Sequence, residues 1–172
     1  MMRVLTETER LLITEMTMDM AETVHRNSLD EDTKRFVPDE VFETPEDARE
    51  TVKFLISQYG SAGGPQVYAV ITKDRGDNIG YVQLCPVGDG RWEIGYHIAK
   101  AYTGKGYATE AVRAFLLVIT RRVGASEVYG IRLRENAASG RVLEKCGFRE
   151  FFAGKGEYHE EMRDISKSVW KA

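Results

Sequence analysis

The sequence predicts an α+β fold in which a mixed, mostly antiparallel central sheet is flanked by helices. Three strand-like segments follow one another through the linkers KDRGD and GDG, whose Gly and Asp residues are typical of hairpin turns. The next segment has apolar residues at the three- and four-residue spacing of a helix. A strand, a second helix and a final hairpin then complete the chain, so hairpins and helical connections occur together.

The size and charge of the chain restrict its class. Its 172 residues predict one domain, residues 1–172. The net charge of −3 lacks the basic excess of nucleic-acid-binding proteins. We expect no membrane association, because no apolar run reaches about 18 residues. The first residues lack the apolar stretch of an export signal, which favours a cytoplasmic location.

The cysteines and histidines predict neither a disulfide framework nor a metal site. Two cysteines and three histidines are scattered without the spacing of metal ligands: Cys85, Cys146, His25, His97 and His159. Reduced thiols are the simplest interpretation.

In the first third of the chain, we expect a strand at residues 9–15, a helix at 17–29 and a polar loop with at most a short helical turn at 30–43. The next helix has a clear start. Thr44 can accept hydrogen bonds from the first free N–H groups, and Pro45 suits the first helical position. This helix should end near Tyr59, because SAGGP follows.

The remaining elements are predicted from turn residues and periodicity. They are strands at 66–72, 78–87 and 91–98, a helix from 104–105 to 123, a strand at 127–133, a helix at 137–146 closed by Gly147, and a hairpin of 148–152 and 158–165.

The segment YTGKGYATEA joins a predicted strand to a predicted helix. A helix start presents free N–H groups and a partial positive charge, and glycine lets a phosphate approach the backbone. The expected donors are the N–H groups of Gly104, Lys105, Gly106, Tyr107 and Ala108. Glycines that merely form the turn are an equally good explanation of an isolated G-x-G. A Walker loop is excluded by the missing Gly-Lys-Ser/Thr ending, and a dinucleotide fingerprint by Thr109 at its third glycine.

A second motif, RENAASGRVLEKCGF, follows about thirty residues later. Asn136, Ser139 and Leu143 fall on one face of the predicted helix. Asn136 and Ser139 are candidate ligand-binding residues. Asn136 can also be a helix cap, alone or together with ligand binding, and Ser139 can be a small packing residue. Gly147 with its neighbouring phenylalanine suits a helix stop.

Together, the two motifs resemble the GNAT superfamily of N-acetyltransferases, and within it the RimJ/RimL branch of ribosomal-protein-alanine N-acetyltransferases. The family pattern Q/R-x-x-G-x-G/A corresponds to residues 101–106, and the second motif to residues 136–148. TERLLIT and WEIGYHI resemble strands of the branch, so the resemblance covers nearly the whole chain.

The resemblance implies an acetyl-CoA-dependent N-acetyltransferase that needs no metal. Acetyl-CoA is expected between two splayed strands, 91–98 and 127–133, with its pyrophosphate on the N–H groups of residues 104–108. Unpaired N–H groups near His97 and Ile98 would bind the pantetheine and polarise the thioester carbonyl. A neutral amine would then attack directly. A catalytically inactive coenzyme-A-binding sensor or interaction module is the alternative.

Two departures from the family pattern matter. Ala101 replaces the usual Gln or Arg, which the branch tolerates. Leu143 stands where many members carry a catalytic tyrosine, so the resemblance makes Ser139 the nearest candidate for the general acid.

The amine must also lose a proton. Glu93 and His97 lie four residues apart on one strand and point to the same side, so either is a candidate base. A solvated role for Glu93 and a packing role for His97 remain open.

The acceptor is an amine, either a protein N-terminus or a small molecule. It should contact the helices and loops of residues 17–60 and the last hairpin. That hairpin carries an acidic cluster, which can attract a cation or simply face solvent: Glu157, His159, Glu160 and Glu161. The protein is expected to be a monomer or a homodimer.

Overall fold

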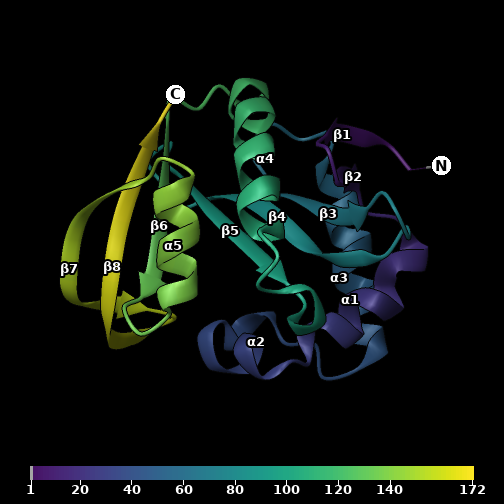
Figure 1. Ribbon diagram of the computed structural model, residues 1–172, viewed down its shortest axis with the longest axis horizontal. Helices are drawn as coiled ribbons and strands as arrows, with labels where there is room; N and C mark the ends of the chain where they lie inside the picture. The colour runs from purple at the N-terminus through teal and green to yellow at the C-terminus, as the bar shows by residue number, and fades with distance from the viewer. Residues whose placement is uncertain (1) are drawn as a thin grey trace.

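The computed structural model describes residues 2–172 (Figure 1). In chain order, the first elements are β1 Val4–Glu7, β2 Leu11–Glu15, η1 Met18–Met20, α1 Ala21–Ser28, α2 Glu31–Phe36, η2 Pro38–Glu40, α3 Pro45–Gln58 and β3 Gln66–Thr72. The remaining ones are β4 Asn78–Pro86, β5 Trp92–Ile98, η3 Lys100–Tyr102, α4 Tyr107–Val123, β6 Glu127–Leu133, α5 Ala137–Lys145, β7 Arg149–Tyr158 and β8 Glu161–Lys171.

Within these residues, eight strands form one sheet in the order β1-β2-β3-β4-β5-β6-β8-β7. Neighbouring strands are antiparallel except β5 and β6, which are parallel. The predicted fold class, a mixed and mostly antiparallel sheet flanked by helices, is therefore confirmed.

Helices cover both faces of the sheet (Figure 1). On one face, α4 packs on the central strands through buried side chains such as Val112, Phe115 and Ile119. On the other face, α1 and α3 enclose a second core that includes Ala21 and Val52. The sequence places these residues at helical spacing, so each helix buries one side.

The short helix α2 contacts β7 and the segment that follows β6. The Tyr158 hydroxyl of β7 donates to the Phe36 carbonyl at 2.7 Å, and Arg35 pairs with Glu135 at 3.1 Å. The sequence predicted only a loop with a short turn here. Asp30 explains the extra helix, because its side chain accepts the N–H of Thr33 at 2.8 Å and caps α2.

The predicted start of α3 is confirmed. The Thr44 side chain accepts from the N–H of Asp47, whose side chain in turn accepts from the N–H of Thr44. Strands β3 to β6 and helix α5 also match their predicted ranges within one residue.

Two predicted boundaries at the start of elements are wrong. The strand predicted at residues 9–15 is β2, and the sequence analysis missed β1, a four-residue strand with both ends exposed. Helix α4 begins at Tyr107 rather than at 104–105. Gly104 and Gly106 have φ values of +77° and +81°, which no helical residue adopts, so the loop persists to Gly106.

The final hairpin was predicted with its turn in the wrong place. Residues 153–157 continue β7, and the turn is formed by His159 and Glu160, with φ values of +49° and +66°. Gly156 lies inside β7, where a Cβ would come within 2.5 Å of the Ile165 side chain. Strand β8 then runs to Lys171, beyond the predicted end, because it pairs with β6 along its length.

Candidate active site

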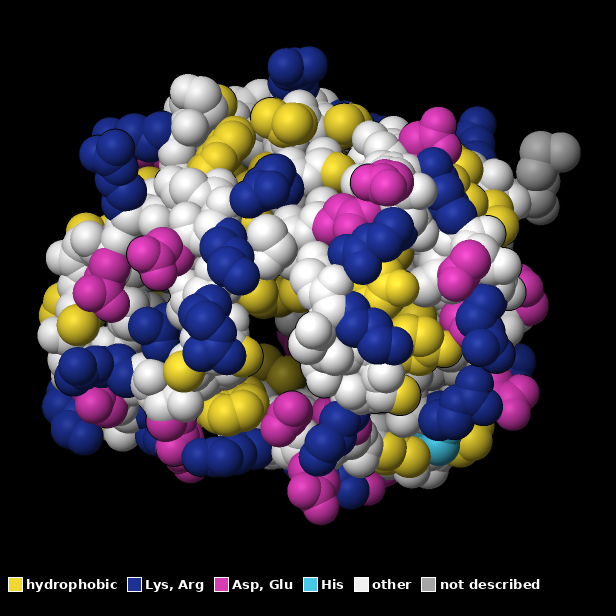
Figure 2. Space-filling view, in the orientation of Figure 1, with side chains coloured by type: hydrophobic (Ala, Val, Ile, Leu, Met, Phe, Trp, Pro, Cys, Tyr) yellow, Lys and Arg dark blue, Asp and Glu magenta, His cyan; other side chains and the backbone are white. Residues whose placement is uncertain are grey.

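Strands β5 and β6 separate along their length and leave a split in the sheet. In the described part of the chain, their only ladder pair is Glu93 with Tyr129. Beyond it lies a cavity of about 330 Å³, bounded by β5, β6, α5 and the start of α4. Figure 2 shows a hollow at this place, with hydrophobic side chains on its wall and Lys and Arg side chains around it.

Backbone N–H groups of β5 point into this split. The N–H of Ala99 donates to Ile79 of β4 at 2.8 Å, so by alternation the odd-numbered residues of β5 bond to β4. The N–H groups of Tyr96 and Ile98 therefore face β6, where no strand residue pairs with them. Unpaired N–H groups were predicted near His97 and Ile98. The N–H of Ile98 faces the split, whereas the N–H of His97 faces β4.

The glycine loop forms one end of the split, because Thr103 and Ala108 line the cavity. Gly104, Lys105 and Gly106 are exposed, and Tyr107 opens α4. Among residues 2–172, no acceptor is found for the backbone N–H groups of residues 104–108. These free donors at a helix start can bind an anion.

Arg10 braces this loop from the turn between β1 and β2. Its guanidinium donates to the Lys105 carbonyl at 3.0 Å and to the Glu110 carboxylate at 2.7 Å, and it lies 4.3 Å from the centre of the Tyr107 ring. Burial acts to raise the pKa of Glu110, but hydrogen bonds from Thr8 and Arg10 lower it. Arg10 thus balances an acidic residue in the first turn of α4, where a free negative charge would repel an anion.

Helix α5 forms one wall of the split. Asn136 caps α5 by accepting the N–H of Ser139 at 3.2 Å. The Ser139 hydroxyl lies 2.7 Å from the Tyr96 hydroxyl, which also donates to the Ser139 carbonyl at 3.1 Å. Leu143 is buried, and a Cβ on Gly130 would come within 3.0 Å of it. Asn136, Ser139 and Leu143 all line the split, as their shared helix face predicts.

The candidate bases lie on the other face of the sheet. Glu93 pairs with Cys85 and His97 with Tyr81 in the β4–β5 register, so both side chains face α1 and α3. His97 Nε2 is 3.0 Å from Asp30 Oδ2 and 3.3 Å from Thr33 Oγ1. Burial raises the pKa of Glu93, and His159 and Lys167 partly oppose this shift. Within the described residues, the Glu93 carboxylate has no hydrogen-bond or ion-pair partner.

The acidic cluster of the last hairpin is mainly solvent-exposed. Glu157, Glu160 and Glu161 are exposed at or beside the turn, and His159 is held 2.6 Å from Asp39 of η2. Tyr158 and His159 line the split, so this hairpin reaches the site mainly through these two side chains.

Sequence reasoning missed three residues of the site: Arg10 and Tyr96, which contact predicted site residues, and Glu40, which lines the same cavity. Arg10 and Glu40 reach the site from distant segments, and nothing local in the sequence marks them. Tyr96 could have been found, because strand alternation places it opposite Glu93 and His97, on the face that α5 covers.

Two features are absent from residues 2–172, a membrane-spanning helix and a metal-binding cluster. No helix there is long and apolar enough to cross a membrane. In the same described range, no group of three or more His, Cys, Asp or Glu residues is arranged to hold a metal ion.

Comparison with known proteins identifies the family to which this fold belongs. Residues 10–149 match the family model described as the acetyltransferase (GNAT) domain. An uncharacterized N-acetyltransferase of Bacillus subtilis, YnaD, is 30% identical over 143 residues, which are 83% of this chain and 81% of the relative. The chain belongs to the GNAT acetyltransferase family and is an N-acetyltransferase.

Solved structures show the same fold. The crystal structure of a GNAT-family acetyltransferase from Bacillus anthracis has a TM-score of 0.82 and 26% identity, covering 99% of this chain and 98% of that chain. RimL, a ribosomal L7/L12 α-N-protein acetyltransferase, was solved with coenzyme A and has a TM-score of 0.83 at 16% identity, covering 98% of both chains. The microcin C7 self-immunity acetyltransferase MccE, solved with acetyl-CoA and AMP, has a TM-score of 0.80 at 14% identity, covering 96% of this chain and 94% of that chain.

Proposed function

We propose that this protein transfers the acetyl group of acetyl-CoA to a primary amine, by direct attack in a complex that holds both substrates. The observation that carries the proposal is the split between β5 and β6. It connects the free N–H groups at the start of α4 with the half-buried carboxyl group of Glu93. The coenzyme complexes of RimL and MccE, which share the fold, support acetyl-CoA as the donor.

The residues of the split fit coenzyme A from end to end. The free N–H groups of residues 104–108 suit the pyrophosphate, and Lys105 adds a positive charge. Apolar side chains, among them Ile94, Ile98, Val142 and Leu143, suit the pantetheine. The N–H groups of Tyr96 and Ile98 can bind its amides or the thioester carbonyl. Acetyl-CoA supplies an activated acetyl group at the far end of this path.

Glu93 is better placed than His97 to take the proton of the amine. A path that starts at the α4 terminus passes Ile98 first and reaches Glu93 last, where β5 and β6 meet. The raised pKa of Glu93 makes its carboxylate a better proton acceptor near neutral pH. His97 Nε2 is already engaged with Asp30, so we assign His97 a positioning role.

Ser139 and Tyr96 are placed to assist the departing thiolate. Burial raises the pKa of Tyr96, although its hydrogen bond with Ser139 lowers it, so the hydroxyl stays protonated at neutral pH. When the single hydroxyl proton of Tyr96 is donated to the Ser139 hydroxyl rather than to the Ser139 carbonyl, the hydroxyl proton of Ser139 is free for the sulfur. The pair replaces the hydrogen-bonding capacity that Leu143 lacks.

The proposed base and the thiolate-assisting pair lie on opposite faces of the sheet. Strand alternation directs Glu93 toward α1 and α3, and Tyr96 toward α5. The amine is therefore expected to enter from the α1–α3 face, and the thiolate to leave toward α5.

A turnover assay tests the proposal. Thiol release from acetyl-CoA is measured with N-terminal peptides, polyamines, aminoglycosides and amino acids, each with and without protein. The proposal predicts amine-dependent thiol release together with an acetylated amine. Tight binding of acetyl-CoA with no release for any amine would instead favour the non-catalytic sensor.

A further inference from the structure

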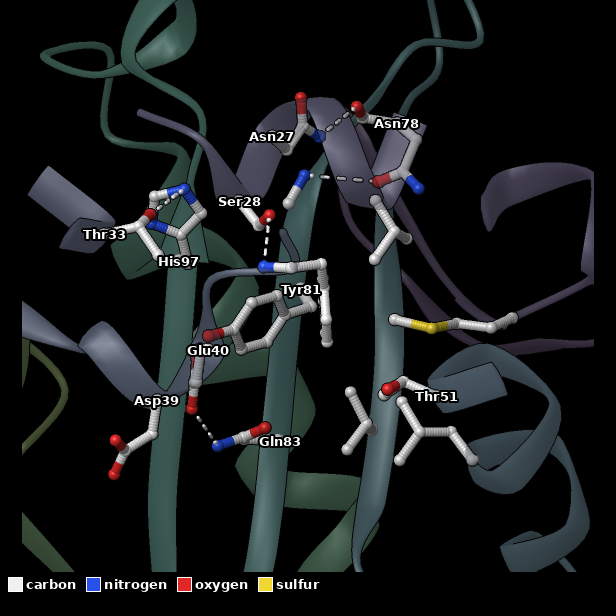
Figure 3. Close-up of a pocket in the computed structure, with 16 residues that line it drawn as sticks. Asn27, Ser28, Thr33, Asp39, Glu40, Thr51, Asn78, Tyr81, Gln83 and His97 are labelled. Carbon is white, nitrogen blue, oxygen red and sulfur yellow. Dashed lines mark hydrogen bonds between the residues drawn. The ribbon is translucent and has the colours of Figure 1, made fainter. Parts of the chain in front are cut away.

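A second cavity of about 280 Å³ opens on the α1–α3 face and adjoins the split. It lies between α1, α3, η2 and the strands β3 and β4 (Figure 3). The two cavities share four lining residues: Glu40, Tyr81, Gln83 and His97. A molecule in this second cavity can therefore present one end to the acetyl site.

The walls of the cavity are largely apolar. Met16, Val24, Phe42, Leu55 and Val67 contribute hydrophobic side chains from both sides. The volume is just below the lower end of the range for small-molecule pockets, roughly 300–1,000 Å³. Such a site suits a compact apolar group and disfavours a chain of several charges.

Two buried polar atoms on the cavity wall have no partner within residues 2–172: Glu40 Oε2 and Asn78 Nδ2. Glu40 Oε1 accepts from Gln83 Nε2 at 3.2 Å, which leaves Oε2 as the free oxygen. Asn78 Oδ1 accepts the N–H of Gly80 at 3.2 Å, and this bond fixes the amide with Nδ2 as the free donor. Buried polar atoms are nearly always paired, so both indicate an absent partner.

The free acceptor and the free donor lie at opposite ends of the cavity. Figure 3 shows Glu40 beside Gln83 at one end and Asn78 at the other, with Tyr81 between them. Asn78 and Gln83 are five positions apart on β4, and a strand advances roughly 3.3 Å per residue. The two atoms therefore fit an elongated occupant with a cationic end and an oxygen at its other end.

We propose that the acetyl acceptor is an elongated primary amine with one positive charge, a compact apolar body and a hydrogen-bond-accepting oxygen at the far end. Glu40 binds the amine beside Glu93, the apolar body fills the space between α1 and α3, and Asn78 donates to the oxygen. This inference rests on the proposed transferase function and specifies its substrate class.

A matched series of amines tests the inference. Tyramine has all three features, phenethylamine lacks the far oxygen, methylamine lacks the apolar body, and putrescine carries a second charge. We expect kcat/KM to fall in the order tyramine, phenethylamine and then the other two, with at least about tenfold between phenethylamine and methylamine. Calorimetry with coenzyme-A-saturated protein should show the affinities of the four amines in the same order.

Two variants and a control locate the site. Thr51→Phe adds a ring to the cavity wall and should lower the ratio of tyramine to methylamine kcat/KM about tenfold or more. Lys53→Phe adds the same ring to an exposed position of α3 and should leave that ratio unchanged. Glu40→Gln should raise KM for tyramine without changing the affinity for acetyl-CoA. Thermal melting checks that each variant is folded.

The outcomes separate this inference from the transferase proposal. Preference for putrescine or methylamine, or an unchanged ratio in folded Thr51→Phe, would overturn the assigned substrate class while acetyl transfer stands. Equal rates for tyramine and phenethylamine would show that Asn78 does not donate a hydrogen bond to the far oxygen of the substrate. If no amine is acetylated and none binds the coenzyme-saturated protein, both proposals fail.

Discussion

Replacing Glu93 by glutamine is expected to lower kcat/KM by about 10²–10⁴-fold at pH values below the pKa of the acceptor amine. An α-amino acceptor has a pKa near 8, and an alkylamine such as tyramine has a pKa of about 10, so below these values the amine arrives protonated and needs a base. The loss should shrink as the pH rises and free amine becomes abundant. The measurement is the pH profile of kcat/KM for wild type and Glu93→Gln.

The sign of the pH dependence follows from the raised pKa of Glu93. In the wild type, kcat/KM should fall as the pH drops through this raised pKa, because the protonated carboxyl group cannot accept a proton. Glu93→Gln should lack this step. His97→Ala should reduce the rate without removing it, and Glu50→Gln, an exposed change on α3, should match the wild type. A loss in Glu93→Gln that is equal at every pH would assign Glu93 to packing or binding.

Ser139→Ala is expected to lower kcat by about 10²-fold, the weak end of general acid catalysis, because a thiolate is already a fair leaving group. The affinity for acetyl-CoA should hardly change. Tyr96→Phe removes the hydroxyl that lies 2.7 Å from Ser139 Oγ and should give a loss of the same kind. Since the two hydroxyl groups act as one unit, the double variant should lose little more than Ser139→Ala alone.

Ser57→Ala, which removes an exposed serine hydroxyl from α3, serves as the control for this pair. If kcat of folded Ser139→Ala stays within about twofold of wild type, Ser139 is a packing residue and the thiolate leaves unaided. Additive losses in the double variant would show that Tyr96 and Ser139 act separately.

Local patterns were sufficient to predict most of the fold. Turn residues and alternation located β3, β4 and β5, and Thr44 with Pro45 marked the start of α3. The errors occur where a distant segment decides the structure. β1 is an edge strand stabilised by pairing with β2, and β8 continues to Lys171 because β6 lies beside it.

The residues of the site also divide into those that local patterns predicted and those that only distant contacts bring to the site. The motifs marked the loop at Gly104 and Gly106 and the helix start at Asn136, because each needs a particular local geometry. They gave no information about Arg10 or Glu40. Both lie far along the chain from the residues that they contact, and only tertiary packing brings them there.

Calorimetric titration of coenzyme A tests most directly whether the split and its glycine loop form the coenzyme site. Gly106→Leu places a side chain over the free N–H groups at the start of α4. Gly124→Leu, at the other end of the same helix, is a matched control, since Gly106 and Gly124 have φ values of +81° and +72°. A Cβ at Gly124 meets nothing within 4 Å, and at Gly106 only Arg10 at 3.5 Å.

Our expectation is that wild type and Gly124→Leu bind coenzyme A, and that Gly106→Leu binds it at least about tenfold more weakly, the equivalent of about one charge-assisted hydrogen bond. Equal affinity in folded Gly106→Leu, or no binding by the wild type, would contradict it.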